Sequence, residues 1–297
     1  MLARMQRESI DFMSFFLMAV VALLLPWSLA YRFYYRLAGR PWLFRQRVCK
    51  AHANASKLLG IHDDHEWCRR HRLILMLDVI DFWISFLQPW RVRHLVQQDG
   101  EWPDDRPLVI VGTHWGPAFM LLRSLYNHAI QPIYVLRKNP SSVFRGERIR
   151  QLYVSCRRLH MRRMFPGKRY QPGGFPRPLL RALQMNESIL VLADVPASSK
   201  RGFRTISLYD SNARIDPGMF DLFVSRQAHF ATYRLEFDFS SGQRLLSIQN
   251  IDRPGDSEDY WLTLDAFIAG TLQSDSAQWN LWQVADSYFV DLRSTPG

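Results

Sequence analysis

Residues 108–117 read LVIVGTHWGP, and this stretch decides the fold. Its first four residues are all aliphatic, which is typical of a strand buried on both faces of a sheet. Two glycines and a proline then interrupt the apolar run, as expected where a strand gives way to a helix. We therefore predict a strand, a turn and a helix in succession, with His114 in the turn at the carboxyl end of the strand.

The pattern on both sides of this stretch indicates an α/β fold. Residues 45–98 are mainly helical in pattern, because leucines and isoleucines recur at spacings of three and four. Further strands are predicted at 131–136, 188–192, 228–234 and 244–249, and helices at 117–127, 142–160 and 175–184. Alternation of this kind favours a central mixed sheet flanked by helices. We expect a single α/β domain at 101–297, preceded by an N-terminal membrane segment at 1–40 and a helical lead-in at 41–100.

The composition is that of a folded and basic protein. Of its 297 residues, 47% are hydrophobic and 13% are aromatic, which excludes an intrinsically disordered chain. The net charge of +11 indicates an acidic partner, which could be nucleic acid, an anionic membrane face, or a phosphate-bearing substrate or carrier. The 3 cysteines match neither a disulfide framework nor a metal-site spacing, so reduced thiols are expected.

Residues 12–31 form an almost uncharged run, FMSFFLMAVVALLLPWSLAY. The run is long enough to cross a hydrocarbon core of about 30 Å as a helix. Basic residues are more numerous after the run than before it, which places the main domain on the cytoplasmic side by the positive-inside rule. The sequence therefore predicts a membrane-spanning helix. A segment that lies in the membrane plane and a buried core helix interrupted at Pro26 are the alternatives.

His114 is the first candidate for chemistry. The carboxyl ends of strands in open α/β sheets commonly host functional sites. A histidine there can accept the proton of a hydroxyl or amine that attacks a thioester, while backbone N–H groups at the start of the next helix stabilise the oxyanion. A histidine after an apolar strand is more often a structural hydrogen-bonding residue, so this segment by itself does not assign catalysis.

Four segments follow one another in an order that matters for function. They are HWGPAF at 114–119, RKNP at 137–140 with a basic helix after it, ILVLAD at 189–194, and SAQWNLW at 276–282. Together with the N-terminal apolar run and the helical lead-in, they resemble the lipid A lauroyl/myristoyl acyltransferase family of the lysophospholipid acyltransferase superfamily. The resemblance covers nearly the whole chain.

The resemblance implies an acyltransferase that moves a fatty acyl group from an acyl carrier protein or coenzyme A thioester to a hydroxyl or amine. The acceptor would be a lipid, a glycolipid or a small amphiphile. The thioester is a co-substrate, and no resident cofactor or metal is implied. The resemblance also implies a location at the bacterial inner membrane, with the main domain on the cytoplasmic side.

The resemblance further implies roles for particular residues. His114 corresponds to the catalytic base, and Asp194 corresponds to a carboxylate at the end of the family's later strand, which would organise the site. The family carries a substrate-binding arginine in the basic helix, and the register from Asn139 and Pro140 favours Arg150 as its counterpart. In total, five residues are expected to bind substrate: Trp115, Gly116, Arg145, Arg148 and Arg150.

The histidine motif of this chain departs from the family at one position. The family has an acid where Phe119 stands here. That acid normally fixes the imidazole tautomer and stabilises the imidazolium. Three explanations remain open: Asp194 reaches His114 across neighbouring strand ends, or His114 serves a more reactive amine acceptor, or the protein binds without catalysing. The last would make it a catalytically silent lipid-binding or scaffold protein of the same fold.

Other charged segments carry weaker signals. The cluster HDDHE at 62–66 resembles a helix cap with exposed charges and lacks a distant ligand set, so no metal site is predicted. The basic residues match no recognisable nucleic-acid-binding motif, so no nucleic-acid partner is predicted. The arginine-rich stretch 145–169 is either a solvated helix face or a landing surface for acidic groups.

Overall fold

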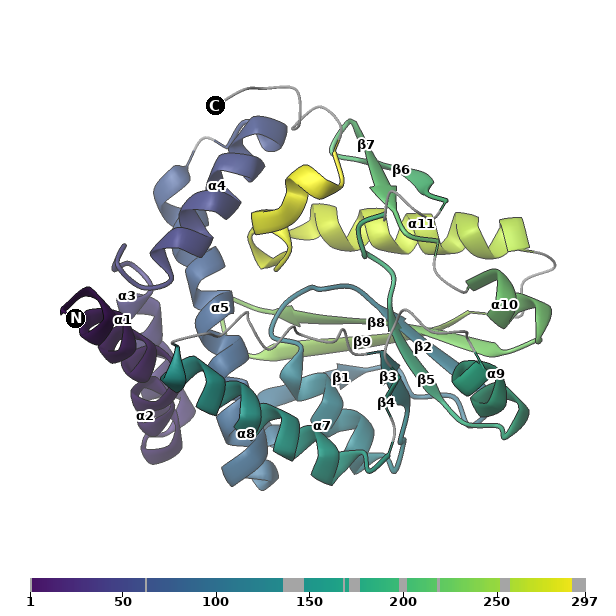
Figure 1. Cartoon of the computed structure of the whole chain (residues 1–297), viewed down its shortest axis with the longest axis horizontal. Helices are drawn as coiled ribbons and strands as arrows, with labels where there is room; N and C mark the ends of the chain where they lie inside the picture. Colours follow the sequence, from purple (N-terminus) through teal and green to yellow (C-terminus); the bar gives the residue numbers. More distant parts are fainter. Residues whose placement is uncertain are drawn as a thin grey trace.

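The structure is a computed structural model. It describes residues 2–61, 63–135, 147–167, 169–170, 177–197, 202–217, 220–251 and 257–289. A mixed sheet at its centre is flanked by helices, which confirms the predicted α/β fold class (Figure 1).

The central sheet has 7 strands in the order β1-β9-β8-β2-β5-β3-β4. Their bounds are β1 Val96–Asp99, β2 Leu108–Gly112, β3 Ile133–Val135, β4 Arg169–Tyr170, β5 Ile189–Leu192, β8 His229–Phe237 and β9 Arg244–Ile251. Neighbouring strands are parallel except β8 and β9, which form an antiparallel pair. A separate antiparallel hairpin consists of β6 Arg204–Leu208 and β7 Ser211–Ile215. The sheet is therefore mixed, with parallel strands at its centre.

Alternate residues of β2 enter two different hydrophobic cores, as a strand buried on both faces requires. Leu108 and Ile110 join a core with α5 Asp64–Leu87, α7 Phe119–Asn127 and α8 Arg148–Met164. Val109 and Val111 join a second core with α4 Arg45–Leu59, α9 Arg177–Gln184, α10 Phe220–Ser225 and α11 Ser257–Ser274. Figure 1 shows α11 on one side of the sheet and α7 and α8 on the other.

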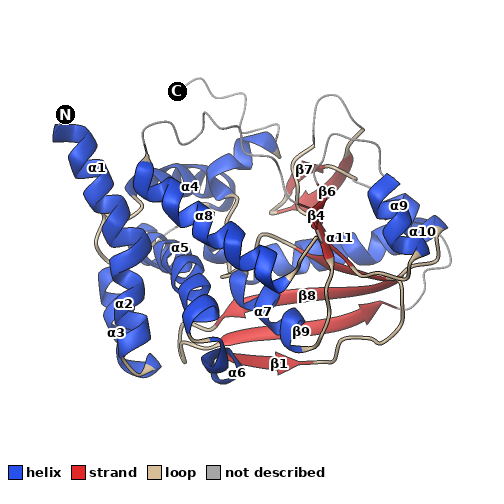
Figure 2. Cartoon of the chain, turned by 60° about the horizontal axis from the view of Figure 1, so that its bottom comes forward, coloured by secondary structure: helices blue, strands red, loops and turns tan. Residues whose placement is uncertain are grey.

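The N-terminal apolar run does not form the predicted spanning helix. Residues Leu2–Leu24 are helical, with a π-helical segment at Met13–Leu17 between α1 Leu2–Phe12 and α2 Met18–Leu24. Leu25 is extended because the residue before a proline is disfavoured in helical geometry, and Trp27–Leu37 then begins a new helix, α3. Figure 2 shows these helices at one end of the molecule, with α1 and α2 running in line.

A membrane span can also be sought by length and apolar composition. No single helix in the described part of the chain is long and apolar enough to cross a membrane. Two consecutive helical segments, Asp64–Leu87 and Pro89–Leu95, are long and apolar enough when taken together, but the chain bends by 114° between them. Most of α5 is buried inside the domain, where it packs against the sheet.

Several predicted boundaries shift in the structure. The helical lead-in ends in a strand, β1. Of the helix predicted at 142–160, the described part is α8, which begins at Arg148 and extends to Met164, whereas the predicted start lies outside the described residues. The hairpin β6–β7 and the helices α10 and α11 were not predicted. The predicted cap at the start of α5 is confirmed, since the side chain of Asp63 accepts a hydrogen bond from the backbone N–H of Glu66.

Candidate active site

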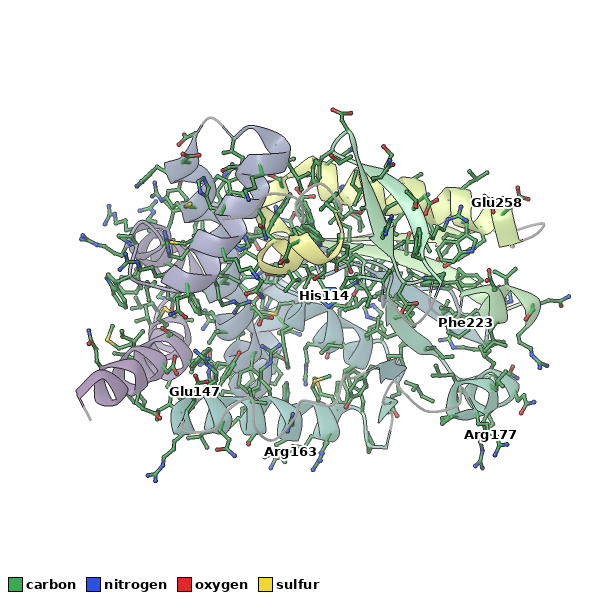
Figure 3. The ribbon with its side chains drawn as sticks, turned by 45° about the horizontal axis from the view of Figure 1, so that its top comes forward. His114, Glu147, Arg163, Arg177, Phe223 and Glu258 are labelled. Atoms are coloured by element: carbon green, nitrogen blue, oxygen red, sulfur yellow. The ribbon has the colours of Figure 1, made fainter. Side chains whose placement is uncertain are left out.

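His114 and Asp194 meet because their strands are parallel neighbours. β2 and β5 pair so that Gly112 lies opposite Leu192. His114 comes 2 residues after Gly112, and Asp194 comes 2 residues after Leu192. Equal distances beyond the ends of adjacent parallel strands bring the two side chains to the same edge of the sheet. Figure 3 shows His114 near the middle of the molecule.

The carboxylate of Asp194 accepts hydrogen bonds from three donors. Its Oδ1 lies 2.9 Å from Nδ1 of His114, while its Oδ2 accepts from the backbone N–H of His114 at 2.8 Å. The indole N–H of Trp279 also donates to Oδ2, at 2.9 Å. The side chain is only 1% exposed. Three donors on a buried carboxylate fix its position.

This arrangement sets the protonation of the imidazole. An ionised carboxylate accepts hydrogen bonds only, so Nδ1 of His114 carries a proton and Nε2 presents its lone pair when the ring is neutral. Burial lowers the pKa of His114, but the charge of Asp194 and its hydrogen bond outweigh burial and hold the pKa above its usual value. The His114 side chain is 34% exposed, so a substrate can reach it. This is the geometry of a general base with an orienting acid.

The segment after α11 holds the histidine turn in place. The backbone N–H of Asn280 donates to the carbonyl of His114 at 2.9 Å, and the N–H of Gly116 donates to the carbonyl of Gln278 at 3.0 Å. The side-chain amide of Asn280 donates to the carbonyl of Gly116 at 2.7 Å. These bonds make an antiparallel bridge between Trp115 and Trp279. The turn is therefore fixed on both sides of the catalytic candidate.

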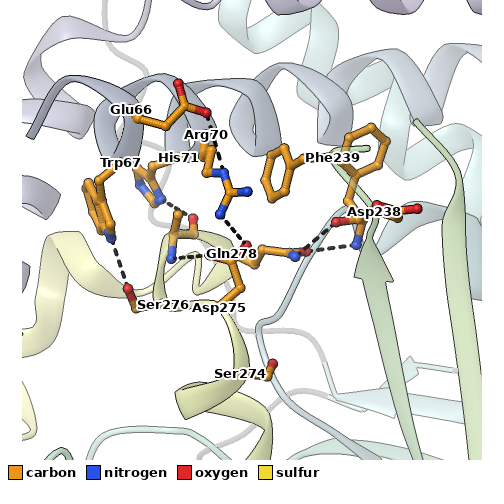
Figure 4. A network of polar contacts seen from close by, with 12 residues as sticks. Glu66, Trp67, Arg70, His71, Asp238, Phe239, Ser274, Asp275, Ser276 and Gln278 are labelled. Atoms are coloured by element: carbon orange, nitrogen blue, oxygen red, sulfur yellow. Dashed lines mark hydrogen bonds and ion pairs between the residues drawn. The ribbon is translucent and has the colours of Figure 1, made fainter. Parts of the chain in front are cut away.

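The same C-terminal segment is anchored to α5, as Figure 4 shows. Trp67 donates through its indole N–H to the hydroxyl of Ser276 at 3.0 Å, and Nδ1 of His71 lies 2.9 Å from the carbonyl oxygen of Ala277. Gln278 bonds the backbone N–H and carbonyl of Phe237 in β8. Position and orientation of His114 thus depend on contacts between segments far apart in the sequence.

Two positions near the site require glycine. Gly116 has a φ of +60°, and a Cβ atom there would lie 2.0 Å from the carbonyl oxygen of Leu235. At Gly112, a Cβ would lie 2.2 Å from the phenol ring of Tyr233 on β8. These contacts are far inside van der Waals distance, so a side chain at 116 would displace the turn and one at 112 would displace the buried ring of Tyr233.

Phe119 lies in the hydrophobic core shared by α5, α7 and α8. It is buried at the start of α7 and packs edge-on against Phe82 and stacked on His160, with ring centroids at 5.2 and 5.7 Å. The guanidinium of Arg157 lies 4.9 Å from the Phe119 centroid. Of the three explanations for the altered motif, the first requires that Asp194 reach His114, and the 2.9 Å between Oδ1 of Asp194 and Nδ1 of His114 meets that requirement.

Of the predicted arginines, the described Arg148 and Arg150 make polar contacts with the N-terminal helix and with Glu147, not with His114. Arg150 pairs with Asp11 of α1 at 3.2 Å and with Glu147 at 2.9 Å, and Glu8 caps the backbone N–H groups of Arg148 and Ile149 at 2.9 and 3.0 Å. Figure 3 places Glu147, at the start of α8, away from His114. Arg145 lies outside the described residues. In this structure Arg150 joins α8 to the N-terminal helix.

Trp115 and Gly116, the remaining predicted residues, help to shape the turn. Trp115 is 2% exposed and belongs to the core on the α11 side of the sheet, so its ring packs inside the protein. The site also contacts three residues that were not predicted individually from the sequence: Trp279, Asn280 and Tyr288. The hydroxyl of Tyr288 donates to the backbone carbonyl of Asp194. The tryptophan-rich sequence 279–282 was the available clue.

The described residues contain no group of three or more histidine, cysteine or acidic side chains placed to hold a metal ion. No family model matches the chain, and the search of curated proteins found no match either. The resemblance to lipid A acyltransferases therefore stays a prediction, and the chemistry of this site rests on its geometry.

Proposed function

We propose that this protein is an acyltransferase in which His114 is the general base and Asp194 its orienting acid. The observation that carries the proposal is the pair of bonds from His114 to one buried carboxylate, through Nδ1 and through the backbone N–H. A base held this way presents Nε2 in a fixed direction and in the correct tautomer.

The proposed reaction transfers a fatty acyl group from a thioester to a hydroxyl or amine. Nε2 of His114 takes the proton of the acceptor as its oxygen or nitrogen bonds to the thioester carbonyl carbon. The carbon–sulfur bond then breaks, and the imidazolium returns the proton to the leaving thiolate. Asp194 stabilises the imidazolium between these steps, because its negative charge is buried and adjacent.

The partners in this proposal follow from the family resemblance and from charge. The donor is acyl carrier protein or coenzyme A thioester, both acidic, and the net charge of +11 suits either. The acceptor is a lipid, a glycolipid or a small amphiphile at the cytoplasmic side of the bacterial inner membrane. The reaction needs no resident cofactor.

The test is mass spectrometry of detergent-purified protein incubated with acyl carrier protein and coenzyme A thioesters in the presence of membrane extract. An acylated product is expected from the parent chain and not from His114→Ala. His128→Ala is the matched control, because His128 is an exposed histidine at the end of α7. No product from the parent, with lipid still bound, would favour the silent lipid-binding alternative.

A further inference from the structure

The N-terminal helices expose a row of large apolar side chains, which we name the N-terminal apolar face. Its principal members are exposed by 43% to 76% and are Phe12, Leu17, Val20, Leu24, Leu29 and Phe33. Along α1 and α2 their spacing keeps them on one side of the helical rod. Large exposed apolar surfaces of this kind mark contact with a partner or with a membrane.

The opposite side of the same helices is fixed to the protein. Phe15, Met18, Ala22 and Tyr34 are buried in the core shared with α5. The indole N–H of Trp83 on α5 donates to the carbonyl of Phe15 at 2.6 Å. Because one side of these helices packs against the domain, only their other side is available to lipid.

The face continues beyond α2 onto the end of α5 and the turn after it. Leu87 and Trp90 are exposed by 47% and 60%. Arg91 ties this segment to the end of α2, because its guanidinium donates to the carbonyl of Ala22 at 2.7 Å and of Leu25 at 3.3 Å. A tryptophan at the edge of an apolar surface is typical of the membrane–water interface.

The charges beside the face are positive. Arg32, Arg36 and Arg40 recur every 4 residues along α3 and the turn after it, and all are exposed. The acidic residues of α1, Glu8 and Asp11, are instead engaged by α8. Apolar side chains bordered by arginines match a bilayer with anionic headgroups. A second copy of the chain would bring arginines against arginines, which disfavours self-association through this face.

We infer that the N-terminal apolar face lies in the plane of an anionic membrane and attaches the domain from one side, without crossing the bilayer. This inference does not depend on acyl transfer. It also replaces the predicted spanning helix. A spanning helix would be surrounded by lipid, whereas here the same residues contact protein on one side and lipid on the other.

Vesicle flotation tests the attachment. The full chain is expected to float with phosphatidylglycerol-containing vesicles and to bind phosphatidylcholine vesicles more weakly, with salt reducing the difference. The double variant Leu24→Glu/Leu29→Glu should lower partitioning by about tenfold or more. Leu262→Glu is the matched control, since Leu262 is 61% exposed on α11, away from the face. Unchanged partitioning of the double variant, or a soluble oligomer that ignores vesicles, overturns the inference.

Sided labelling distinguishes in-plane attachment from a span. Gln6 precedes the run and Cys49 follows it, and both are exposed. In sealed inside-out membrane vesicles, an impermeant maleimide should label Gln6→Cys and Cys49 from the same side, as identified by peptide mass spectrometry. Labelling from opposite sides means that the run crosses the bilayer and overturns the inference. Neither result affects the assay for acyl transfer.

Discussion

Replacing Asp194 with asparagine is the sharpest perturbation of the proposed site. The amide is nearly isosteric, so its oxygen can still accept at the position of Oδ2, where the N–H of His114 and the indole of Trp279 converge. Its NH₂ group then faces Nδ1 of His114 in place of Oδ1. An NH₂ group donates, so Nδ1 must become the acceptor and the proton moves to Nε2. The base is then lost although the fold is retained.

The expected result is a fall in kcat of about 10³- to 10⁴-fold, the range for a base held in the wrong tautomer. The pKa of His114 should also fall, because burial lowers it and the opposing charge has been removed. In the parent chain, kcat/KM should drop as pH decreases through the raised pKa of His114, since the imidazolium cannot accept a proton. Any residual kcat/KM of Asp194→Asn should decrease only at a lower pH than in the parent chain.

The assay is product formation from an acyl thioester over a range of pH, with near-ultraviolet circular dichroism to check folding. Asp221→Asn is the matched control, because Asp221 also accepts a hydrogen bond from an indole, that of Trp261 at 3.1 Å, in another part of the fold. A folded Asp194→Asn protein with kcat within about tenfold of the parent would refute the assigned role of the carboxylate.

Three further predictions concern the turn, the altered motif and stability. Gly116→Ala should lower the free energy of unfolding by about 2–4 kcal/mol, because its left-handed backbone and the carbonyl of Leu235 leave no room for Cβ; urea unfolding that matches the parent would contradict this. Phe119→Asp should lower the free energy of unfolding by about 3–5 kcal/mol, since the new carboxylate is placed in an aromatic core. It should not restore activity to Asp194→Asn; restored product formation in the thioester assay would show that position 119 reaches the site. Burial lowers the pKa of His71 to about 4, so His71 is neutral in the folded protein at pH values where the unfolded chain binds a proton. Stability should therefore fall by about 2 kcal/mol between about pH 7 and 5 through this group alone, and His71→Asn should lose that part of the pH dependence.

The part of the fold nearest the site was predictable from local sequence. β2 is an unbroken aliphatic run between loop-forming residues, so its burial on both faces and the position of His114 after it follow from composition and spacing. β1 is different. Its sequence, VQQD, is polar and exposed after the half-buried Val96, and it is a strand only because it pairs with β9, which lies far along the chain. No local pattern contains that pairing.

The N-terminal run shows why hydropathy alone misassigned a segment. Met18 and Ala22 are buried against the domain, whereas Val20 and Leu24 are exposed, yet all four are apolar. A scale that scores each residue by type gives both sides the same value. Only the packing against α5 separates the side that faces protein from the side that is open.

The role of Arg150 could not be deduced from its helix for a similar reason. Its partner Asp11 lies 139 residues earlier in the chain, and the carboxylate of Glu8 caps the start of the same helix. A basic helix in the sequence is equally consistent with a substrate site and with internal ion pairs. In this structure Arg150 pairs with Asp11 on another helix and with Glu147 at the start of its own helix, and the basic pattern alone does not contain the first of these pairings.

In the proposed site, an aromatic ring at position 119 and a carboxylate at position 194 are compatible parts of one arrangement. An acid at the start of α7 would have to leave the core of α5 and α8 to approach the imidazole, whereas Asp194 already lies beside it by register. Position 119 packs as an aromatic ring against Phe82, while the proposed orienting carboxylate comes from the residue beyond the end of β5. The carboxylate in turn needs Trp279 to satisfy its second oxygen, which explains why a C-terminal tryptophan belongs to the site. A motif that is incomplete along the sequence can therefore be complete in space, provided that the missing group lies at the same level on the adjacent parallel strand.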